Sequence, residues 1–402
     1  MKIGCIALNS NLIACDKQTS IIKYLTNNLY EIGESISLIS YFDNSLEKLK
    51  NVYSEKPDIL FVIGTDDVIY NHNIKDNLAR ISGEKLEANQ NALMSLKKYC
   101  EKYNINFSMQ EDMEVLLPTN SIALTYDDTY SSGFVSKSGN TYMIFLPNDI
   151  EFVKYNYNQY ILPLINDLVS STCKTQVIKV FGILEKDIKN FLSEYYGIDG
   201  LTITIVGDGL DNTVFVRSIT TLDENKSRDV ISGIISKLNK FIYSLENVSI
   251  YKMAVDMLKI QHKTITIGDT ITYGNITNRI AEIDPSVITS SSIYTSFEKI
   301  KLDLSIDTNT IKDYGEYSVN TIYECANSLL SKSTGDIALF VLGSKATDTC
   351  FVAVGDLDGI HVYKNKINIK NSDLQENLSK TAMFYLIKKL KQNDLCFWKN
   401  SV

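Results

Sequence analysis

The spacing of apolar residues along the first part of the chain predicts short strands that alternate with helices. Short apolar runs fit strands, whereas longer stretches with apolar residues three or four positions apart fit helices. The expected strands are 2–8, 36–42 and 58–64, and the expected helices are 19–33, 86–104 and 152–168. Residues 133–147 are a predicted hairpin that turns at Ser138, Gly139 and Asn140. This alternation favours a mostly parallel sheet covered by helices.

A different pattern fills the middle of the chain, and the alternation of strands and helices resumes after it. The polar segment 171–176 is a predicted linker. The expected middle strands are 175–183, 201–207 and 213–220, and the middle helices are 185–196 and 224–246. After residue 250 the expected strands are 264–269, 286–294, 336–343, 350–356 and 360–365. The helices expected there are 255–263, 272–283, 318–332 and 374–392. The Ser/Thr-rich run before Tyr294 is interpreted as the end of a buried strand.

These patterns predict an α/β protein with three domains. A chain of 402 residues is longer than one compact core usually accommodates. We expect an N-terminal three-layer α/β/α domain at 1–168, a small α+β module at 169–248 and a C-terminal α/β domain at 249–402.

Composition and charge exclude several classes of protein. Charged residues make up 22% of the chain, and no apolar run approaches the roughly 20 residues that a membrane-spanning helix needs. The start of the chain, 1–18, predicts a strand and not a signal peptide. A net charge of −8 without a cluster of Lys or Arg argues against a nucleic-acid partner, because phosphate binding needs local positive charge. We therefore expect a soluble, cytoplasmic protein with neither a nucleic-acid nor a membrane partner.

The residues that usually bind metals are sparse. The seven cysteines include no CxxC pair, which indicates reduced thiols and neither a disulfide framework nor a zinc site. Asp66 and Asp67 follow a predicted parallel strand, where ligands of α/β proteins bind, but such a pair is more often a helix cap or a solvated loop. Asp127 and Asp128 lie in a polar loop without an evident partner. We expect no metal and no cofactor.

The order of the elements resembles the competence/damage-inducible protein A (CinA) family over nearly the whole chain. Residues 293–299, IYTSFEK, are similar to the family's VAYSNEAK motif and keep Tyr294 and Lys299 in register. Residues 269–274, DTITYG, fall where the family has ESCTGG. Two further segments match the family's HGAVS and TGxAGP motifs in position, namely YGEYS at 314–318 and LGSKAT at 342–347.

The resemblance implies a nicotinamide mononucleotide deamidase domain at 249–402. Hydrolysis of a carboxamide needs a nucleophile, a base and N–H donors for the oxyanion. The family's serine nucleophile corresponds to Thr270, and the resemblance implies that Tyr294 and Lys299 act beside it. Lys299 would serve as the base only if desolvated. The implied substrate-binding residues are Asp269, Thr272, Gly274, Gly343 and Ser344. The turn 269–274 is expected to offer free N–H groups at a helix start.

Each of these residues also has a structural interpretation. An isolated threonine such as Thr270 or Thr272 more often ends a strand or caps a helix than acts as a nucleophile. Lys299 stands close to Lys301, which favours an ordinary solvated lysine.

The first half of the chain resembles the family's molybdopterin-binding-like domain in layout more than in chemistry. The family's GTELLLG and TGGLGPTxDD loops correspond to 9–15 and 63–72, where Gly64 is kept and Asn71 and His72 replace the paired aspartates. Glycine-rich loops bind phosphate because glycines let backbone N–H groups turn toward the anion. The loss of these glycines counts against the metal-assisted ADP-ribose pyrophosphatase activity that the family resemblance implies for this domain.

The middle module resembles the family's KH-like module. Residues 181–188, FGILEKDI, are similar to the family's FGIGES pattern and keep Gly182 and Glu185. No GXXG loop flanked by basic residues accompanies it, so a scaffold role is favoured over RNA binding.

Two main hypotheses of function remain open. The first is a nicotinamide-nucleotide amidohydrolase that acts through Thr270, Tyr294 and Lys299. The second is a catalytically inactive relative that binds a nucleotide or a protein partner, because the segments 9–15, 63–72 and 269–274 all depart from the family's motifs. The pyrophosphatase is a weaker third hypothesis. The resemblance also implies a homodimer that binds a small-molecule nucleotide.

Overall fold

A computed structural model describes the fold of residues 1–8, 15–42, 45–106, 112–168, 173–219, 224–343, 349–366 and 373–399. The chain divides into two compact units, one of Met1–Thr175 with Arg217–Leu222 and the other of Gln176–Val216 with Asp223–Val402. The predicted domain limits at 168 and 248 remain predictions. No helix in the described ranges is long and apolar enough to cross a membrane.

The first unit is built on a six-stranded sheet with the order β2-β1-β3-β8-β7-β6. Its strands are β1 (Ile3–Leu8), β2 (Ile36–Phe42), β3 (Ile59–Ile63), β6 (Ile122–Leu124), β7 (Gly133–Ser138) and β8 (Thr141–Leu146). Neighbouring strands in the run β2-β1-β3-β8 are parallel, whereas β7 pairs antiparallel with both β8 and β6. The predicted mostly parallel sheet and the hairpin around Gly139 are therefore confirmed. A separate antiparallel pair is formed by β4 (Leu86–Ala88) and β5 (Leu116–Pro118).

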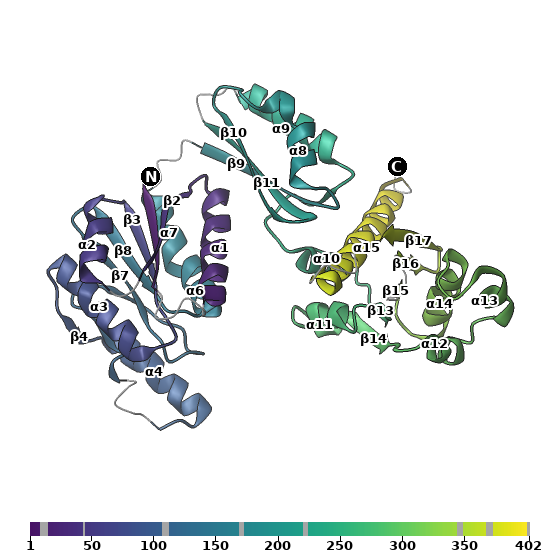
Figure 1. Ribbon diagram of the computed structural model, residues 1–402, viewed down its shortest axis with the longest axis horizontal. Coiled ribbons are helices and arrows are strands. Elements are labelled where there is room, and N and C mark those ends of the chain that lie inside the picture. Colours follow the sequence, from purple (N-terminus) through teal and green to yellow (C-terminus); the bar gives the residue numbers. More distant parts are fainter. Residues whose placement is uncertain are drawn as a thin grey trace. The chain divides into compact units, whose positions relative to one another are not determined.

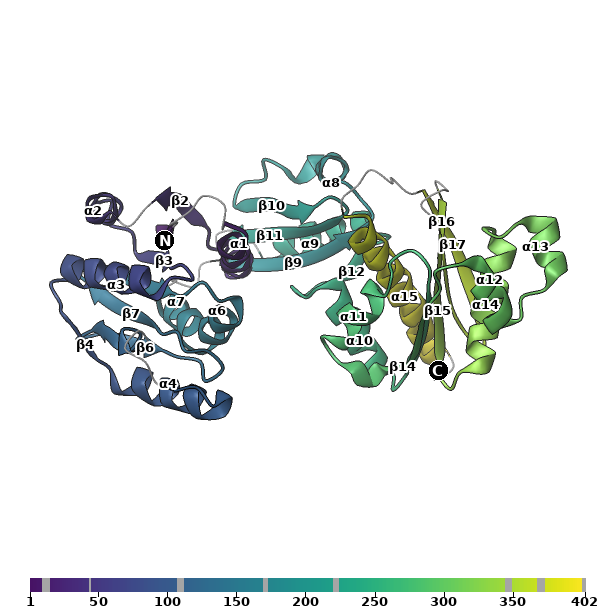
Figure 2. The same ribbon diagram turned by 60° about the horizontal axis from the view of Figure 1, so that its bottom comes forward.

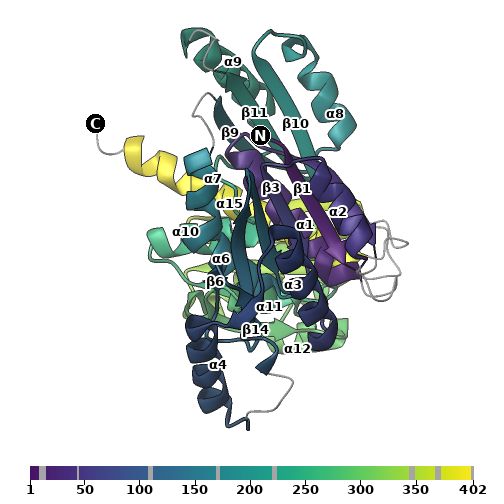
Figure 3. The same cartoon turned by 90° about the vertical axis from the view of Figure 1, so that its left-hand side faces the viewer.

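Helices cover both faces of this sheet, as seen in Figure 1 and, from the side, in Figure 3. The helices are α1 (Cys15–Glu31), α2 (Leu46–Ser54), α3 (Val68–Ser82), α4 (Gln90–Tyr103), α6 (Ile150–Asn156), the π-helical turn η1 (Tyr157–Ile161) and α7 (Leu162–Leu168). Buried residues of α1, α6 and α7 pack on one face, and those of α2, α3 and α4 pack on the other. Two of these helices, α2 and α3, were not expected from the sequence. The expected helix 86–104 is wrong at its start, because 86–88 pair with β5 as a strand.

The second unit contains two sheets. In the first, the order is β10-β11-β9-β12, and α8 (Glu185–Phe191), the turn η2 (Ser193–Tyr195) and α9 (Glu224–Leu238) accompany it. Its strands are β9 (Cys173–Phe181), β10 (Leu201–Asp208), β11 (Asp211–Ile219) and β12 (Ile242–Ser244). The expected helix 224–246 ends early, because Ile242 pairs with Val180 of β9 and Tyr243 is fully buried. The boundary between the two compact units, at Thr175 and Gln176, falls within the expected linker 171–176, although β9 already begins at Cys173.

The second sheet has the order β14-β13-β15-β16-β17. Its strands are β13 (Ile265–Asp269), β14 (Ile288–Ile293), β15 (Ile337–Gly343), β16 (Thr349–Asp356) and β17 (Gly359–Lys366). The helices around it are α10 (Ile250–Ile260), α11 (Asn275–Ala281), the turn η3 (Pro285–Val287), α12 (Phe297–Leu304), α13 (Thr308–Tyr314), α14 (Val319–Lys332) and α15 (Leu374–Lys399). Strand β14 is not buried as expected: it is an edge strand, and 289–291 are exposed.

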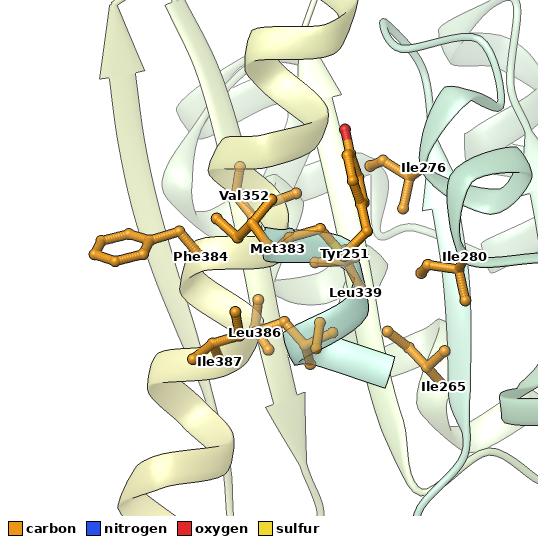
Figure 4. Close-up of a cluster of buried hydrophobic side chains, with 14 of the residues drawn as sticks. Tyr251, Ile265, Ile276, Ile280, Leu339, Val352, Met383, Phe384, Leu386 and Ile387 are labelled. Atoms are coloured by element: carbon orange, nitrogen blue, oxygen red, sulfur yellow. The ribbon is translucent and has the colours of Figure 1, made fainter. Parts of the chain in front are cut away.

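Helices lie on both faces of this sheet (Figure 2), and a hydrophobic core is formed on each face. Residues of α10, α11 and α15 pack on one face, where Met383, Leu386 and Ile387 meet Leu339 and Val352 of the sheet (Figure 4). Residues of α12 and α14 pack on the other face. The first core also extends to the middle module through a contact between the rings of Phe181 and Phe384, whose centroids are 5.4 Å apart.

Candidate functional site

The carboxyl ends of β13, β14 and β15 bring most of the predicted catalytic and binding positions to one edge of the sheet. Asp269 is the last residue of β13, and its carbonyl accepts a hydrogen bond from the N–H of Tyr294 over 2.8 Å. The N–H of Thr270 donates to the carbonyl of Val341 over 3.1 Å, and β15 ends two residues later at Gly343. The backbone at 270, 294 and 343 therefore meets where parallel α/β sheets usually bind ligands.

The carboxylate of Asp269 organises the turn that follows β13. This side chain is fully buried. Its Oδ1 accepts hydrogen bonds from the N–H groups of Ile271, over 3.1 Å, and Thr272, over 2.9 Å. Its Oδ2 accepts from the hydroxyl of Thr272, over 2.5 Å, and from the N–H of Gly274, over 2.6 Å. The free N–H groups expected in this turn are therefore occupied by a carboxylate of the protein itself.

Two residues of the turn adopt left-handed backbone conformations. Tyr273 has φ 52° and Gly274 has φ 88°. A Cβ atom at position 274 would come within 2.7 Å of Cδ1 of Ile293 on β14. Glycine is required there both by its backbone conformation and by the close approach of β14.

The hydroxyl of Thr270 is engaged with β15. It lies within 3.1 Å of the Val341 carbonyl and 2.9 Å of the Gly343 carbonyl, either of which accepts its single proton. It also accepts a hydrogen bond from the N–H of Gly343 over 2.9 Å. Neither acceptor is a group that could serve as a general base. The side chain is partly exposed, whereas Thr272 is buried.

The side chain of Tyr294 packs into the core. It is only 5% exposed, and its ring stacks on that of Phe340 with centroids 5.9 Å apart. Burial raises the pKa of its phenol, so the group stays protonated at neutral pH and can donate but not accept a proton. The backbone of Tyr294 therefore lies at the predicted site, whereas its ring packs in the hydrophobic core.

The remaining predicted residues are less well placed. Lys299 lies on α12 and is exposed, so the desolvation that a catalytic lysine needs is not provided by the described residues. Ser344 lies outside the described residues. A residue that the sequence did not indicate, Cys350, lies beside Gly343, with Sγ 3.4 Å from where a Cβ would stand. Burial raises the pKa of this thiol to about 12, with a further contribution from Asp269, so it is not a nucleophile.

The loop after β3 in the first unit also uses its polar residues internally. Asp67 is the N-cap of α3 and accepts a hydrogen bond from the N–H of Tyr70 over 3.0 Å, which confirms the capping interpretation. Asp66 is exposed and pairs with Lys17 over 3.0 Å. The amide of Asn148 donates to the other oxygen of Asp66 over 3.2 Å.

Asn71, in the place of a family aspartate, holds the same loop. Its Oδ1 accepts from the N–H of Thr65 and its Nδ2 donates to the Thr65 carbonyl, both over 2.8 Å. A Cβ at Gly64 would lie 2.6 Å from Asn71 Oδ1, so the retained glycine makes room for this amide. Gln18 fills the space beside it, because its Nε2 donates to the carbonyls of Leu8 and Gly64.

A cavity of about 350 Å³ lies at this edge of the first unit. Its lining comes from α1, from the loops after β3 and β8, and from the segment before β7, and consists of Lys17, Ser20, Thr65, Asp66, Thr129, Tyr130, Ser131, Pro147, Asn148, Asp149 and Ile150. Most of these residues carry no motif. Only the rule that ligands bind at carboxyl ends of parallel strands would have indicated Thr65 and Asn148 from the sequence.

No group of three potential metal-ligating His, Cys, Asp or Glu side chains occurs within the described ranges. The acidic pair without an evident partner in the sequence has partners on α4. Asp127 accepts from Ser95 and Lys98, and Asp128 pairs with Lys102.

Comparison with known proteins finds relatives that match along most of the chain. A competence-damage inducible protein of Caldicellulosiruptor saccharolyticus is 22% identical over 417 residues, which cover 96% of this chain and 99% of the relative. One of Bacillus pumilus is 21% identical and covers 98% of this chain and 99% of its own length. A CinA-like protein of Dictyoglomus thermophilum is 20% identical over 85% of this chain and 86% of its own. The chain is similar to CinA-like and competence-damage inducible proteins along most of its length. No family model matches the chain.

Solved structures of the CinA superfamily are similar to part of this CinA-like chain. One from Klebsiella pneumoniae is 17% identical, covers 36% of this chain and 96% of its own, and has a TM-score of 0.34. The protein CinA from Thermoplasma acidophilum is 14% identical, covers 42% and 98%, and has a TM-score of 0.35. The similarity to the family rests on the sequence relatives, which match along most of their length.

The family residues kept in the middle module of the CinA-like chain lie at a turn and at a helix start. Gly182 has φ 84°, and its N–H donates to the carbonyl of Leu210 over 2.9 Å. Glu185 is the first residue of α8. These contacts fit the architectural role expected for the 181–188 motif.

Proposed function

We propose that this CinA-like chain hydrolyses the carboxamide of a nicotinamide nucleotide, such as nicotinamide mononucleotide, to a carboxylate and ammonia. The observation that supports this most directly is the meeting of Thr270, Tyr294 and Gly343 at one sheet edge. Of the two threonine hydroxyls in the turn, only that of Thr270 is partly exposed, because Thr272 is buried and donates to Asp269. Thr270 is therefore the candidate nucleophile of this turn.

In the proposed reaction, the Thr270 oxygen bonds to the carboxamide carbon and its proton passes to a base. The base returns this proton to the nitrogen as the C–N bond breaks and ammonia leaves, and water then hydrolyses the resulting ester to the carboxylate and free Thr270. Lys299 is the candidate base, and substrate bound against α12 would supply the desolvation that its amine needs. Catalytic hydrogen bonds are often formed only in the substrate complex, so the exposed Lys299 remains compatible with this role.

The same step can provide an oxyanion donor. The N–H of Gly343 now donates to the Thr270 hydroxyl. When that oxygen turns toward a substrate, this N–H is released beside the attacked carbon, where it can stabilise the oxyanion. The three N–H groups bound to Asp269 would remain structural.

One observation favours a second function, a relative that binds a nucleotide or a protein partner without hydrolysis. The Thr270 hydroxyl has carbonyl acceptors for its proton and an N–H donor for its lone pair, so it resembles a strand-closing side chain. The structure offers no comparable observation for the ADP-ribose pyrophosphatase, because Asp66 and Asp67 are engaged with Lys17 and the cap of α3.

Ammonia release from nicotinamide mononucleotide by the full chain tests the proposal. We expect turnover in the parent, loss of it in Thr270→Ala, and equal or faster turnover in Thr270→Ser, whose hydroxyl is less hindered. Thr202→Ala, an exposed threonine of β10, is the matched control.

The outcomes separate the candidate functions. Unchanged turnover in Thr270→Ala would contradict the assignment of the nucleophile. If neither the parent nor Thr270→Ser releases ammonia, the hydrolase is excluded, and calorimetric titration with the same nucleotide tests the binding function.

A further inference from the structure

Tyr273 has an unusual backbone conformation for its place in the fold. The other non-glycine residues with positive φ in the described ranges are Lys56, Asn104, His262 and Ser305, and each lies just after the end of a helix. A left-handed residue is ordinary there, because it ends the helix by redirecting the chain. Tyr273 instead precedes α11, with φ 52°, and a side chain of this size is unfavourable in that conformation. The family's ESCTGG motif has a glycine at this position, which adopts such a φ without strain.

The turn holds the side chain of Tyr273 at the surface. The N–H of Asn275 donates to the carbonyl of Thr272 over 3.1 Å, so Tyr273 and Gly274 are the two central residues of a tight turn. The carboxylate of Asp269 binds the N–H groups on both sides of Tyr273 and fixes this backbone. The tyrosine is 47% exposed. The protein therefore keeps a large aromatic side chain in contact with solvent, in a conformation that costs stability.

This ring is close to a substrate that is bound at Thr270. The two residues are three positions apart, and three residues span at most about 11 Å. On one side of the turn, the N–H of Gly343, the candidate oxyanion donor, reaches the Thr270 hydroxyl. On the other side, Gly274 lies against Ile293, whose side chain is 50% exposed. With the oxyanion on the β15 side, Tyr273 and Ile293 offer an exposed aromatic and an exposed apolar surface to the rest of the substrate.

We propose that Tyr273 binds the pyridinium ring of the nicotinamide nucleotide and determines a preference for its positively charged form. The inference rests on the proposed function, which supplies the ligand. The pyridinium ring of nicotinamide mononucleotide carries a positive charge, and the face of an aromatic ring attracts a cation. The reduced nucleotide has the same carboxamide, ribose and phosphate, but its ring is uncharged. Tyr273 is a binding residue in this scheme and takes no part in the making or breaking of bonds.

Calorimetric titration with oxidised and reduced nicotinamide mononucleotide tests this role. The titrations use full-length Thr270→Ala, so that turnover does not obscure binding, and ammonia release is measured in the parent background. Tyr273→Leu should raise the Kd of the oxidised form, and the KM for ammonia release, about five- to thirtyfold, with kcat little changed. The Kd of the reduced form should change by less than about twofold, and Tyr273→Phe, which keeps the aromatic face, should bind like the parent.

Two further variants separate the ring from the fold. Tyr273→Gly removes the ring and also the strain, so it should unfold at an equal or higher urea concentration than the parent. It should nevertheless bind the oxidised form as weakly as Tyr273→Leu, which a folding defect would not explain. Tyr323→Leu removes a ring of similar exposure, 49%, from α14 and should leave both affinities unchanged.

The inference and the proposed function can fail separately. Unchanged binding of the oxidised form by Tyr273→Leu, or equal weakening of both redox forms, would overturn the role of the ring even where ammonia is released. If the oxidised form binds in a Tyr273-dependent way and the parent releases no ammonia, the inference stands and only hydrolysis is excluded. A chain that binds neither form overturns the inference.

Discussion

The ends of β3 and β13 occupy equivalent places in their sheets, yet they use their acidic residues in opposite ways. After β3, Asp67 caps a helix and Asp66 remains at the surface beside a cavity of about 350 Å³. After β13, the fully buried Asp269 accepts four hydrogen bonds from the turn that follows it. The end of β3 therefore borders a cavity with polar groups in its lining. The N–H groups of the turn after β13 are instead bound to a carboxylate.

The difference shows why family motifs give limited guidance here. In both places the residue that replaces a family residue has taken a structural role: Asn71 holds the Thr65 backbone, and Asp269 holds the turn. A ligand at the β13 edge must find donors other than the N–H groups that Asp269 occupies. The N–H of Gly343, which donates to the Thr270 hydroxyl, is the first such group.

The largest effect on stability is expected from a buried ion pair in the first unit, close to the cavity at the end of β3. Lys75 of α3 and Glu114 are almost fully buried, with Nζ 2.7 Å from Oε2, and Glu114 also binds Ser132, next to the cavity lining. Lys75→Met leaves a buried carboxylate without its cation and should lower the free energy of unfolding by about 3–5 kcal/mol. Urea denaturation measures this change.

The exposed pair of Lys98 with Asp127 is the matched control. Lys98→Met should change the free energy of unfolding by less than about 1 kcal/mol, because solvent screens such a pair. A Lys75→Met variant as stable as Lys98→Met would show that the buried pair does not stabilise the first unit more than an exposed pair does.

The second largest effect on stability is expected from Asp269, whose carboxylate holds the turn after β13. Asp269→Ala leaves the N–H groups of Ile271, Thr272 and Gly274 without their acceptor and should cost about 2–4 kcal/mol of unfolding free energy. The loss should open the surroundings of Cys350, so this thiol should react faster with a thiol reagent than in the parent. Cys5, buried in the first unit with its pKa raised to about 12, reports any general loosening. Equal acceleration at both cysteines would contradict a local role for Asp269.

Much of the fold was predictable because its strands are buried apolar runs. β1, β3 and β15 are fully buried, and their apolar runs are easily recognised in the sequence. α3 was missed because its apolar residues are few and interrupted by Asn71, His72 and Asn73, and packing of Ile74 and Leu78 on the sheet decides its conformation. β14 was taken for a buried strand because its Ser/Thr run sits between apolar residues, which does not reveal which strand becomes the edge.

The site was predictable in position but not in its internal bonding. Register with the family placed Thr270, Tyr294 and Gly343 at one edge, and the backbone hydrogen bonds bring them together. The capture of the turn's N–H groups by Asp269 could not be foreseen, because it depends on the length of the side chain and on the left-handed residues Tyr273 and Gly274. The cavity of the first unit was missed because its lining comes from four separate segments.

The smallest effect on stability is expected at the two adjacent aspartates after β3. Asp67→Ala removes the N-cap of α3 and should lower the free energy of unfolding by about 1 kcal/mol. Asp66→Ala removes an exposed pair with Lys17 and should leave stability nearly unchanged. Urea denaturation of both variants, which differ by one position and lose the same group, measures the difference. If the two variants lose equal stability, the capping bond to Tyr70 contributes no more than a surface ion pair. The cap of α3 would then not hold the loop after β3 in place.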